Sequence, residues 1–173
     1  QWNKTYGGNA DDAAYSLIQT GDGGYAIAGY TSSYGAGGND FYLVKTDSSG
    51  TMQWNRTYGG TKGDLAYSVV KTADGGYALA GYTYSYGVGT PTFTNFWLVK
   101  TDSSGNRLWN MTYGGTNNDQ AYSLITTGDG GYAIAGCTYS YGVGTPTYAN
   151  FWLVKTDSSG NMLWNKTYGG NAD

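Results

Sequence analysis

The sequence predicts an all-β protein made of tandem four-stranded antiparallel sheets. Three observations support this fold class. Tyr, Thr, Trp and Val, which suit a pleated and half-buried sheet, are abundant, and good helix formers are scarce. Gly, Asp, Asn and Ser recur in short groups typical of turns. The chain also repeats itself, with Trp2, Trp54, Trp109 and Trp164 opening successive copies at spacings of 52, 55 and 55 residues.

Each copy contains the same four motifs, WN-x-TYGG, D-x-AYS, DGGYA-x-AG and LVKTDSSG. The second and third copies carry a three-residue insertion, in which SYGAGGNDF becomes SYGVGTPTFTNF or SYGVGTPTYANF. We therefore expect a single repeat domain over residues 1–173. It divides into repeats 2–53, 54–108 and 109–163 and a partial fourth repeat 164–173.

Four strands fit in each copy, and turn signals separate them. Tight turns are expected at GDGG and at DSSG, because Gly accepts the positive φ that such turns require. In the first copy the expected strands are Ala14–Thr20, Tyr25–Thr31, Phe41–Thr46 and Met52–Tyr58.

The alternation of side chains in these strands predicts that both faces of each sheet are covered. In YAIAG, Ala26 and Ala28 share one face, while Tyr25 and Ile27 share the other. Neither face is strongly polar, so each sheet needs a neighbour on both sides. Small residues opposite bulky ones suit sheets stacked against identical copies, as in the blades of a β-propeller or an open stack of blade-like sheets.

The pattern YGG…DDAAYSLIQTGDGGYAIAGYTSS…DFYLVKTDSSG…W resembles the bacterial and archaeal β-propeller repeat family called SBBP. The resemblance covers the whole chain three times over. It implies a four-stranded blade in an exported or surface-attached protein. It implies no activity.

Propellers typically have about 4–8 blades, and this chain supplies three complete sets of strands one to three but four copies of strand four. Three arrangements are compatible with this count. The chain could be an excerpt of a longer array, two chains could form a six-bladed ring, or the stack could stay open and grow end to end. The duplicated WNKTYGGNAD at Trp2–Asp11 and Trp164–Asp173 favours an excerpt or an extending assembly over a self-contained ring.

The composition argues against several partners and compartments. The net charge of −3 and the absence of a basic run argue against nucleic acid, and no apolar stretch is long enough for a membrane span. Cys137 is the only cysteine, so no intrachain disulfide or cysteine metal cluster is expected, and we expect it to be a small buried residue.

No active site, cofactor or metal site is expected. The chain has no His and no Glu, so it has neither a nucleophilic triad nor a Glu-based carboxylate pair. The recurring Asp residues of DGG and TDSSG are expected to bond their own turns. Each of these loops offers one carboxylate, whereas Ca²⁺ needs several converging oxygens.

The longer loops are the better candidates for binding. The two-to-three and four-to-one loops should share one end of each blade, where aromatic rings near Asn and Thr could stack on sugars, contact a protein or fold onto the blade. The acidic residues after YGG could bind a ligand or make a structural hydrogen bond to a neighbouring blade. These candidates are Tyr34, Tyr86, Phe93, Tyr141, Tyr148, Asp12, Asp64 and Asp119.

N-glycosylation sequons recur once per repeat. Asn and the Thr two residues later face the same way on a strand, and strand four should be outermost, so we expect an accessible face. Repeat duplication makes these sites one observation rather than four. The sequon residues are Asn3, Asn55, Asn110 and Asn165.

Two hypotheses of function follow. The leading one is a structural protein of the cell surface or extracellular matrix, which is N-glycosylated and assembles with copies of itself through edge pairing and face stacking. The alternative is a lectin-like or adhesive propeller whose aromatic loops bind carbohydrate or other surface proteins.

Overall fold

Three four-stranded antiparallel sheets follow one another along the chain, and each is a meander whose strands pair in chain order. The computed structural model describes residues 1–170, and it contains no helix in that range. We name the sheets blade 1 (β1–β4), blade 2 (β5–β8) and blade 3 (β9–β12). The strands are β1 Asp12–Gln19, β2 Tyr25–Thr31, β3 Asp40–Thr46, β4 Met52–Tyr58, β5 Asp64–Lys71, β6 Tyr77–Thr83, β7 Asn95–Thr101, β8 Arg107–Tyr113, β9 Asp119–Thr126, β10 Tyr132–Thr138, β11 Asn150–Thr156 and β12 Met162–Tyr168.

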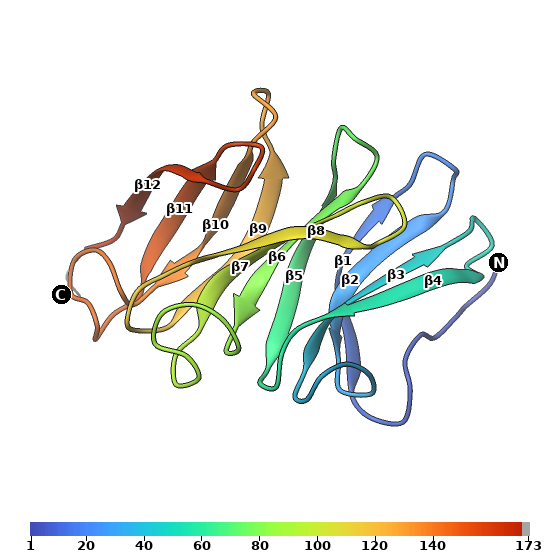
Figure 1. Cartoon of the computed structure of the whole chain (residues 1–173), viewed down its shortest axis with the longest axis horizontal. Helices are drawn as coiled ribbons and strands as arrows, with labels where there is room; N and C mark the ends of the chain where they lie inside the picture. The colour runs from blue at the N-terminus through green and yellow to red at the C-terminus, as the bar shows by residue number, and fades with distance from the viewer. Residues whose placement is uncertain (171–173) are drawn as a thin grey trace.

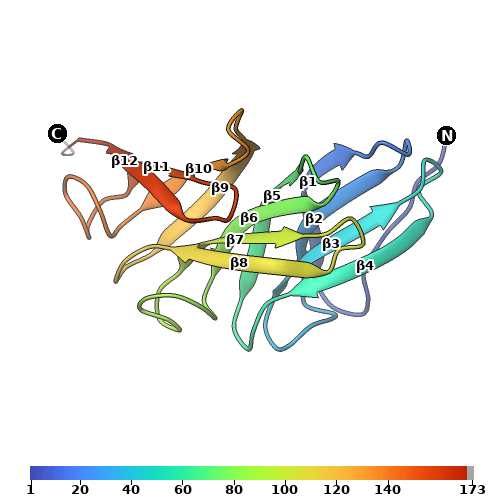
Figure 2. The ribbon, with the colours of Figure 1, turned by 45° about the horizontal axis from the view of Figure 1, so that its top comes forward.

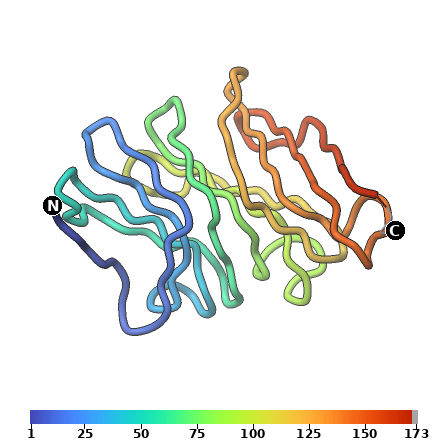
Figure 3. The backbone as a smooth tube through the Cα atoms, turned by 180° about the vertical axis from the view of Figure 1, so that it is seen from behind, coloured from blue at the N-terminus to red at the C-terminus, as the bar shows by residue number. Residues whose placement is uncertain are grey.

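The blades lie side by side in chain order, with the two ends of the described chain at opposite ends of the molecule (Figure 1). The turned view of Figure 2 and the backbone trace of Figure 3 show the same open row. None of the three sheets in the described part of the chain closes on itself. The predicted fold class, tandem antiparallel blades of β-propeller-like form, is confirmed.

The predicted strands differ from the observed ones mainly at β1. This strand begins at Asp12, which pairs with Thr31, and ends at Gln19 rather than Thr20. The backbone N–H of Thr20 donates instead to Gly24 O across the GDGG turn, at 2.9 Å. The third strand begins one residue early, at Asp40. The predicted bounds of the second and fourth strands are confirmed.

A β-bulge interrupts the first strand of every blade at a tyrosine, an irregularity that alternation alone does not predict. The bulged rings form a row across the blades, with centroid separations of 4.7 Å between Tyr15 and Tyr67 and 5.4 Å between Tyr67 and Tyr122. The neighbouring serine links the blades as well, because Ser16 Oγ accepts a hydrogen bond from Val69 N at 3.1 Å. These contacts fix the spacing of the first strands.

The hydrophobic cores lie between the blades. We call the side of a blade that faces the next blade its front face, and the side that faces the preceding blade its back face. The front face of blade 1 contributes the small residues Ala26 and Ala28. The back face of blade 2 contributes bulky residues such as Tyr77 and Leu79, so the predicted division of small and bulky faces is confirmed. Blades 2 and 3 repeat this core.

No helix in residues 1–170 is long and apolar enough to cross a membrane.

Candidate functional site: the blade-to-blade interface

A phenylalanine on each front face anchors the interface with the next blade. The ring of Phe41 packs against Trp97 with the centroids 4.6 Å apart, and Phe96 packs against Trp152 at 4.7 Å. Both phenylalanines are completely buried. A glycine in the second strand makes room for this ring, since a Cβ on Gly136 would lie 2.8 Å from Cζ of Phe96. The phenylalanine is therefore a knob that fills a hole in the next blade.

A tyrosine and a tryptophan of strand four clasp the DSSG turn of the next blade. The hydroxyl of Tyr58 donates to Gly105 O at 2.6 Å, and Tyr113 bonds Gly160 in the same way at 2.7 Å. The indole of Trp54 lies over the same glycine, where a Cβ would be 2.7 Å from its Cζ3. Because Gly105 also has a φ of 78°, any other residue would be strained there. The glycine of DSSG therefore supplies the positive φ of its own turn and also makes room for the tryptophan of the preceding blade.

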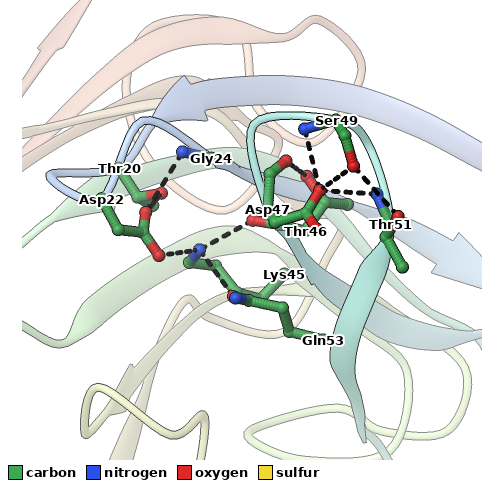
Figure 4. A network of polar contacts seen from close by, with 9 residues as sticks. All are labelled: Thr20, Asp22, Gly24, Lys45, Thr46, Asp47, Ser49, Thr51 and Gln53. Carbon is green, nitrogen blue, oxygen red and sulfur yellow. Dashed lines mark hydrogen bonds and ion pairs between the residues drawn. The ribbon is translucent and has the colours of Figure 1, made fainter. Parts of the chain in front are cut away.

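A buried lysine holds the GDGG and DSSG turns, which lie at the end of the blade opposite the longer loops (Figure 4). Lys45 Nζ pairs with Asp22 Oδ2 at 2.7 Å and also donates to Thr46 O and Gln53 Oε1. Asp22 Oδ1 accepts a hydrogen bond from Gly24 N, which closes the GDGG turn. Lys100 and Lys155 repeat the arrangement with Asp74 and Asp129. This lysine joins two turns that are distant in sequence, a role that the motif LVKT did not reveal.

These ion pairs predict a loss of stability in acid. Hydrogen bonding to lysine holds the pKa of Asp22 well below its ordinary value and lowers the pKa of Asp74 to about 2. A carboxyl with a lowered folded pKa stabilises fully above its unfolded pKa of about 4, and this contribution is lost as the pH falls through the folded pKa. We expect the urea midpoint to fall between pH 4 and pH 2, and to fall less for Asp74→Asn. An equal fall of the urea midpoint with pH in the unmodified protein and in Asp74→Asn would contradict the stabilising role of this ion pair.

Blade 3 exposes the front face that blades 1 and 2 bury. Phe151 is 77% exposed, whereas its counterparts Phe41 and Phe96 are at 0%. Tyr168 is 56% exposed, against 6% or less for the equivalent tyrosines of β4 and β8. A hollow of about 430 Å³ opens on this face, lined almost wholly by apolar atoms. Its lining residues are Tyr122, Ser123, Ala135, Gly136, Cys137, Phe151, Trp152, Leu153 and Tyr168.

Blade 1 presents the complementary back face at the other end of the row. Ala14 and Leu17 are exposed there, while their counterparts in blades 2 and 3 are buried. A small cavity of about 50 Å³ lies beside Gly29 and Tyr42, the blade 1 counterparts of Gly136 and Trp152. This is the position that a phenylalanine of a preceding blade would enter. The two ends of the row therefore match each other as the internal faces do.

The acidic candidates after YGG are part of the blade structure. Asp64 Oδ2 accepts hydrogen bonds from Gly60 N and Ser85 Oγ, both at 2.8 Å. Asp12 and Asp119 make the equivalent bonds to their own repeats. The structural role expected for these residues was a hydrogen bond to a neighbouring blade. Their serine partners lie instead in the same blade as each aspartate. These carboxylates hold the connection from strand four to strand one.

Two carboxylates meet where blade 1 joins blade 2. A Cβ on Gly59 would touch Asp40 Oδ1 and lie 2.8 Å from Asp64 Oδ2, so both groups border the same small space. Asp40 is 1% exposed, and its Oδ1 has no hydrogen-bond partner among residues 1–170. Burial raises the pKa of the Asp40 carboxyl, and the charge of Asp64 raises it further. Blades 2 and 3 have Asn95 and Asn150 at this position.

We expect Asp40→Asn to stabilise the protein by about 0.5–1.5 kcal/mol at pH 7, because it removes a buried charge beside another carboxylate. The raised folded pKa of Asp40 means that its destabilising effect appears as the pH rises above about 4, so the gain should shrink near pH 3. Urea unfolding at both pH values measures this difference.

The matched control is Asn95→Asp, which should destabilise by about 1–3 kcal/mol because it removes the hydrogen bond from Nδ2 to Val88 O. A destabilising effect of Asp40→Asn at pH 7 would show that the Asp40 carboxylate is needed.

The aromatic loop candidates fall into two groups. The hydroxyls of Tyr34, Tyr86 and Tyr141 donate to the glycine carbonyl of YGG, at 3.0, 2.7 and 2.8 Å. Their rings lie over the aromatic residue of strand three, as Tyr86 does over Trp97 at 5.3 Å. Phe93 is half-buried in its own loop, and Tyr148 is half-exposed. The three clamped tyrosines therefore fold onto the blade, which was one of the expected alternatives.

Asn55, Asn110 and Asn165 lie on the outer strands β4, β8 and β12, whereas Asn3 lies in residues 1–8, which belong to no sheet. The exposure of the four side chains differs between repeats. Asn3 and Asn165 are exposed, while Asn55 and Asn110 are only half-exposed. The indole N–H of Trp97 donates to Asn110 Oδ1 at 3.0 Å. This bond engages the amide oxygen of Asn110. It does not involve Nδ2, the atom to which a glycan would be attached.

Cys137 is half-exposed on the front face of blade 3, so the expectation of a buried cysteine is wrong. Its Sγ lies 3.7 Å from the hydroxyl of Tyr122. The equivalent residues of blades 1 and 2 are Tyr30 and Tyr82.

No protein-family model matches this chain, and no curated protein matches it. The resemblance to the SBBP repeat therefore rests on the sequence motifs alone. The fold defines the protein as a tandem array of antiparallel blades whose internal interfaces recur as open faces at both ends of the row.

Proposed function

We propose that this chain is a structural repeat protein that assembles end to end with copies of itself by continuing its internal blade stacking. The observation behind this proposal is the exposure of Phe151, whose counterparts Phe41 and Phe96 are fully buried in the internal interfaces. A second copy offers the back face of its blade 1, which has the corresponding hole beside Gly29. The contact joins two different faces, so it generates a ring if the rotation closes and a filament if it does not.

The size of the exposed face suits a specific interface. Phe151, Trp164 and Tyr168 are three large aromatic residues of this face, and each is largely or half exposed. Aromatic side chains bury about 150–250 Å² each when fully buried, so the parts of these three that are still exposed supply roughly 270–450 Å². A standard interface buries about 800 Å² on each partner. The other exposed apolar residues of the face add to this area, among them Ile125, which is 57% exposed and pairs with Ala133.

An extracellular or cell-surface location and N-glycosylation form part of the same proposal. The sequons at Asn3, Asn55, Asn110 and Asn165 lie at the outer side of the blades, away from the row of tyrosines on the first strands. Glycans there would shield outer strand edges from unwanted pairing. Mass spectrometry of the sequon-bearing peptides of the protein from its native source tests this point, since each glycan adds hexose-sized increments to the mass of the peptide that carries it.

The lectin-like alternative has less support from the geometry. Three of its five aromatic candidates use their hydroxyls to clamp YGG, which leaves Phe93 and Tyr148. Binding of the single chain to a glycan array through Phe93 and Tyr148 would favour the lectin-like alternative.

Sedimentation velocity over a wide concentration range, with electron microscopy of the same samples, tests the assembly. We expect a concentration-dependent series of oligomers and either filaments or rings built from whole chains. A chain that stays monomeric at all concentrations would overturn the proposal.

A further inference from the structure

The segment Gln1–Gly8 lies on the back face of blade 1, in the place that strand four of a preceding blade takes on blades 2 and 3. The hydroxyl of Tyr6 donates to Gly50 O at 2.6 Å, as Tyr58 does to Gly105 and Tyr113 to Gly160. We call this place, formed by Gly50 and Tyr25, the seat.

Trp2 completes the equivalence. A Cβ on Gly50 would lie 2.5 Å from Cζ3 of Trp2, just as the corresponding glycines of blades 2 and 3 meet Trp54 and Trp109. The Trp2 ring is 6.3 Å from that of Tyr25, close to the 6.0 Å between Trp54 and Tyr77. The segment therefore fills the seat with the same two anchors as an internal strand.

The segment differs from an internal strand in how it is held. β4 and β8 are hydrogen-bonded along their length to β3 and β7, whereas residues 1–8 belong to no sheet. Trp2 is 51% exposed. A segment without ladder bonds loses its own chain entropy when it binds, but a strand already fixed in a sheet does not. The seat is thus occupied by a segment that no strand pairing holds in place.

The stronger competitor is β12 of a second copy. Its residues Trp164–Tyr168 repeat the sequence WNKTY of Trp2–Tyr6, and they are fixed by pairing with β11. Continued stacking would place Trp164 and Tyr168 in the seat that Trp2 and Tyr6 hold. Both strands cannot bind there at once.

We propose that Gln1–Gly8 closes the docking seat of blade 1 and that a second copy docks by displacing it with β12. This inference rests on the proposed function, and it adds the site and the competition that regulate it. A tethered segment competes at an effective concentration on the order of 1 mM, so its removal should strengthen docking by about tenfold or more.

The first test uses a synthetic peptide, WNKTYGG with a fluorescent label, and a variant that lacks residues 1–8. We expect the peptide to bind the shortened variant, and to bind the full chain at least about tenfold more weakly. A peptide with Ala for its Trp and Phe for its Tyr is the matched control and should bind neither. Absence of peptide binding to the folded variant, or equal binding to both proteins, would overturn the inference.

The second test separates this inference from the proposed function. The double variant Trp2→Ala/Tyr6→Phe keeps the segment but removes both anchors, so it serves even if the shortened variant fails to fold. In sedimentation velocity we expect it to associate more tightly than the full chain. Peptide binding without any assembly would overturn the proposed function alone. Assembly that is equally tight in the full chain and the double variant would overturn the inference alone.

Discussion

Replacing Phe151 with Asp is expected to abolish end-to-end association while leaving each chain folded. The substitution places a carboxylate where docking would bury a ring against Gly29 and Tyr42 of a second copy, and no cation lines that cavity. Burying an unpaired charge is strongly unfavourable. In the single chain Phe151 is 77% exposed, so little folding stability depends on it. Central aromatic residues commonly contribute 2 kcal/mol or more to an interface, which predicts a dissociation constant raised by at least about 30-fold.

The matched control is Tyr148→Asp. Tyr148 is an aromatic residue with 50% exposure, but it lies in the β10–β11 loop and outside the hollow on the front face. We expect this variant to assemble like the unmodified chain in sedimentation velocity. If Phe151→Asp assembles normally while remaining folded, the front face of blade 3 is not the contact. If Tyr148→Asp also prevents assembly, a general charge effect explains both results.

The second large effect concerns folding. Phe96→Ala is expected to lower the free energy of unfolding by about 3–5 kcal/mol, because it deletes a fully buried ring and leaves a cavity beside Trp152. The repeat supplies its own control, since Phe151→Ala changes the same residue in the same strand position of blade 3. We expect that variant to lose no more than about 0.5 kcal/mol in the monomer.

Urea unfolding at low protein concentration measures both variants. Each blade contacts only its neighbours, so Phe96→Ala should chiefly uncouple blade 3 from blade 2. Fluorescence and circular dichroism would then report transitions that no longer coincide. Similar losses for the two variants would mean that Phe151 is already buried in the form studied.

Much of the fold follows from local sequence patterns. The GDGG and DSSG turns and the alternation in YAIAG predicted the strands and the small and bulky faces, because strand alternation and turn conformation are properties of a few consecutive residues. The start of β1 was placed two residues late, since Asp12 pairs with Thr31 across the sheet rather than with a local partner. The sequence also singled out Tyr34, Tyr86 and Tyr141, but it did not show that their hydroxyls are engaged by YGG.

The residues of the proposed interface were largely missed. In the sequence, Phe151, Gly29 and Gly50 are ordinary members of their repeats. Only the stacking shows what their counterparts do: the phenylalanine packs beside the strand-two glycine of the next blade, and the glycine of DSSG lies against the tryptophan of the preceding strand four. A usable signal was present, because a phenylalanine recurs at the same position of strand three in every repeat. Its meaning depended on which neighbour each face has, and that is a property of the whole array.

The duplicated WNKTYGG illustrates this division. The sequence by itself determined that both copies are strand-four motifs, because the repeat is nearly identical and its strand and turn preferences are local. Only the tertiary structure decided that Trp164–Gly170 contributes to the paired strand β12, while Trp2–Gly8 occupies a seat on blade 1 without joining a sheet. The physical reason is that strand pairing and aromatic packing require partners that are distant in the chain, and identical segments adopt different states when those partners differ.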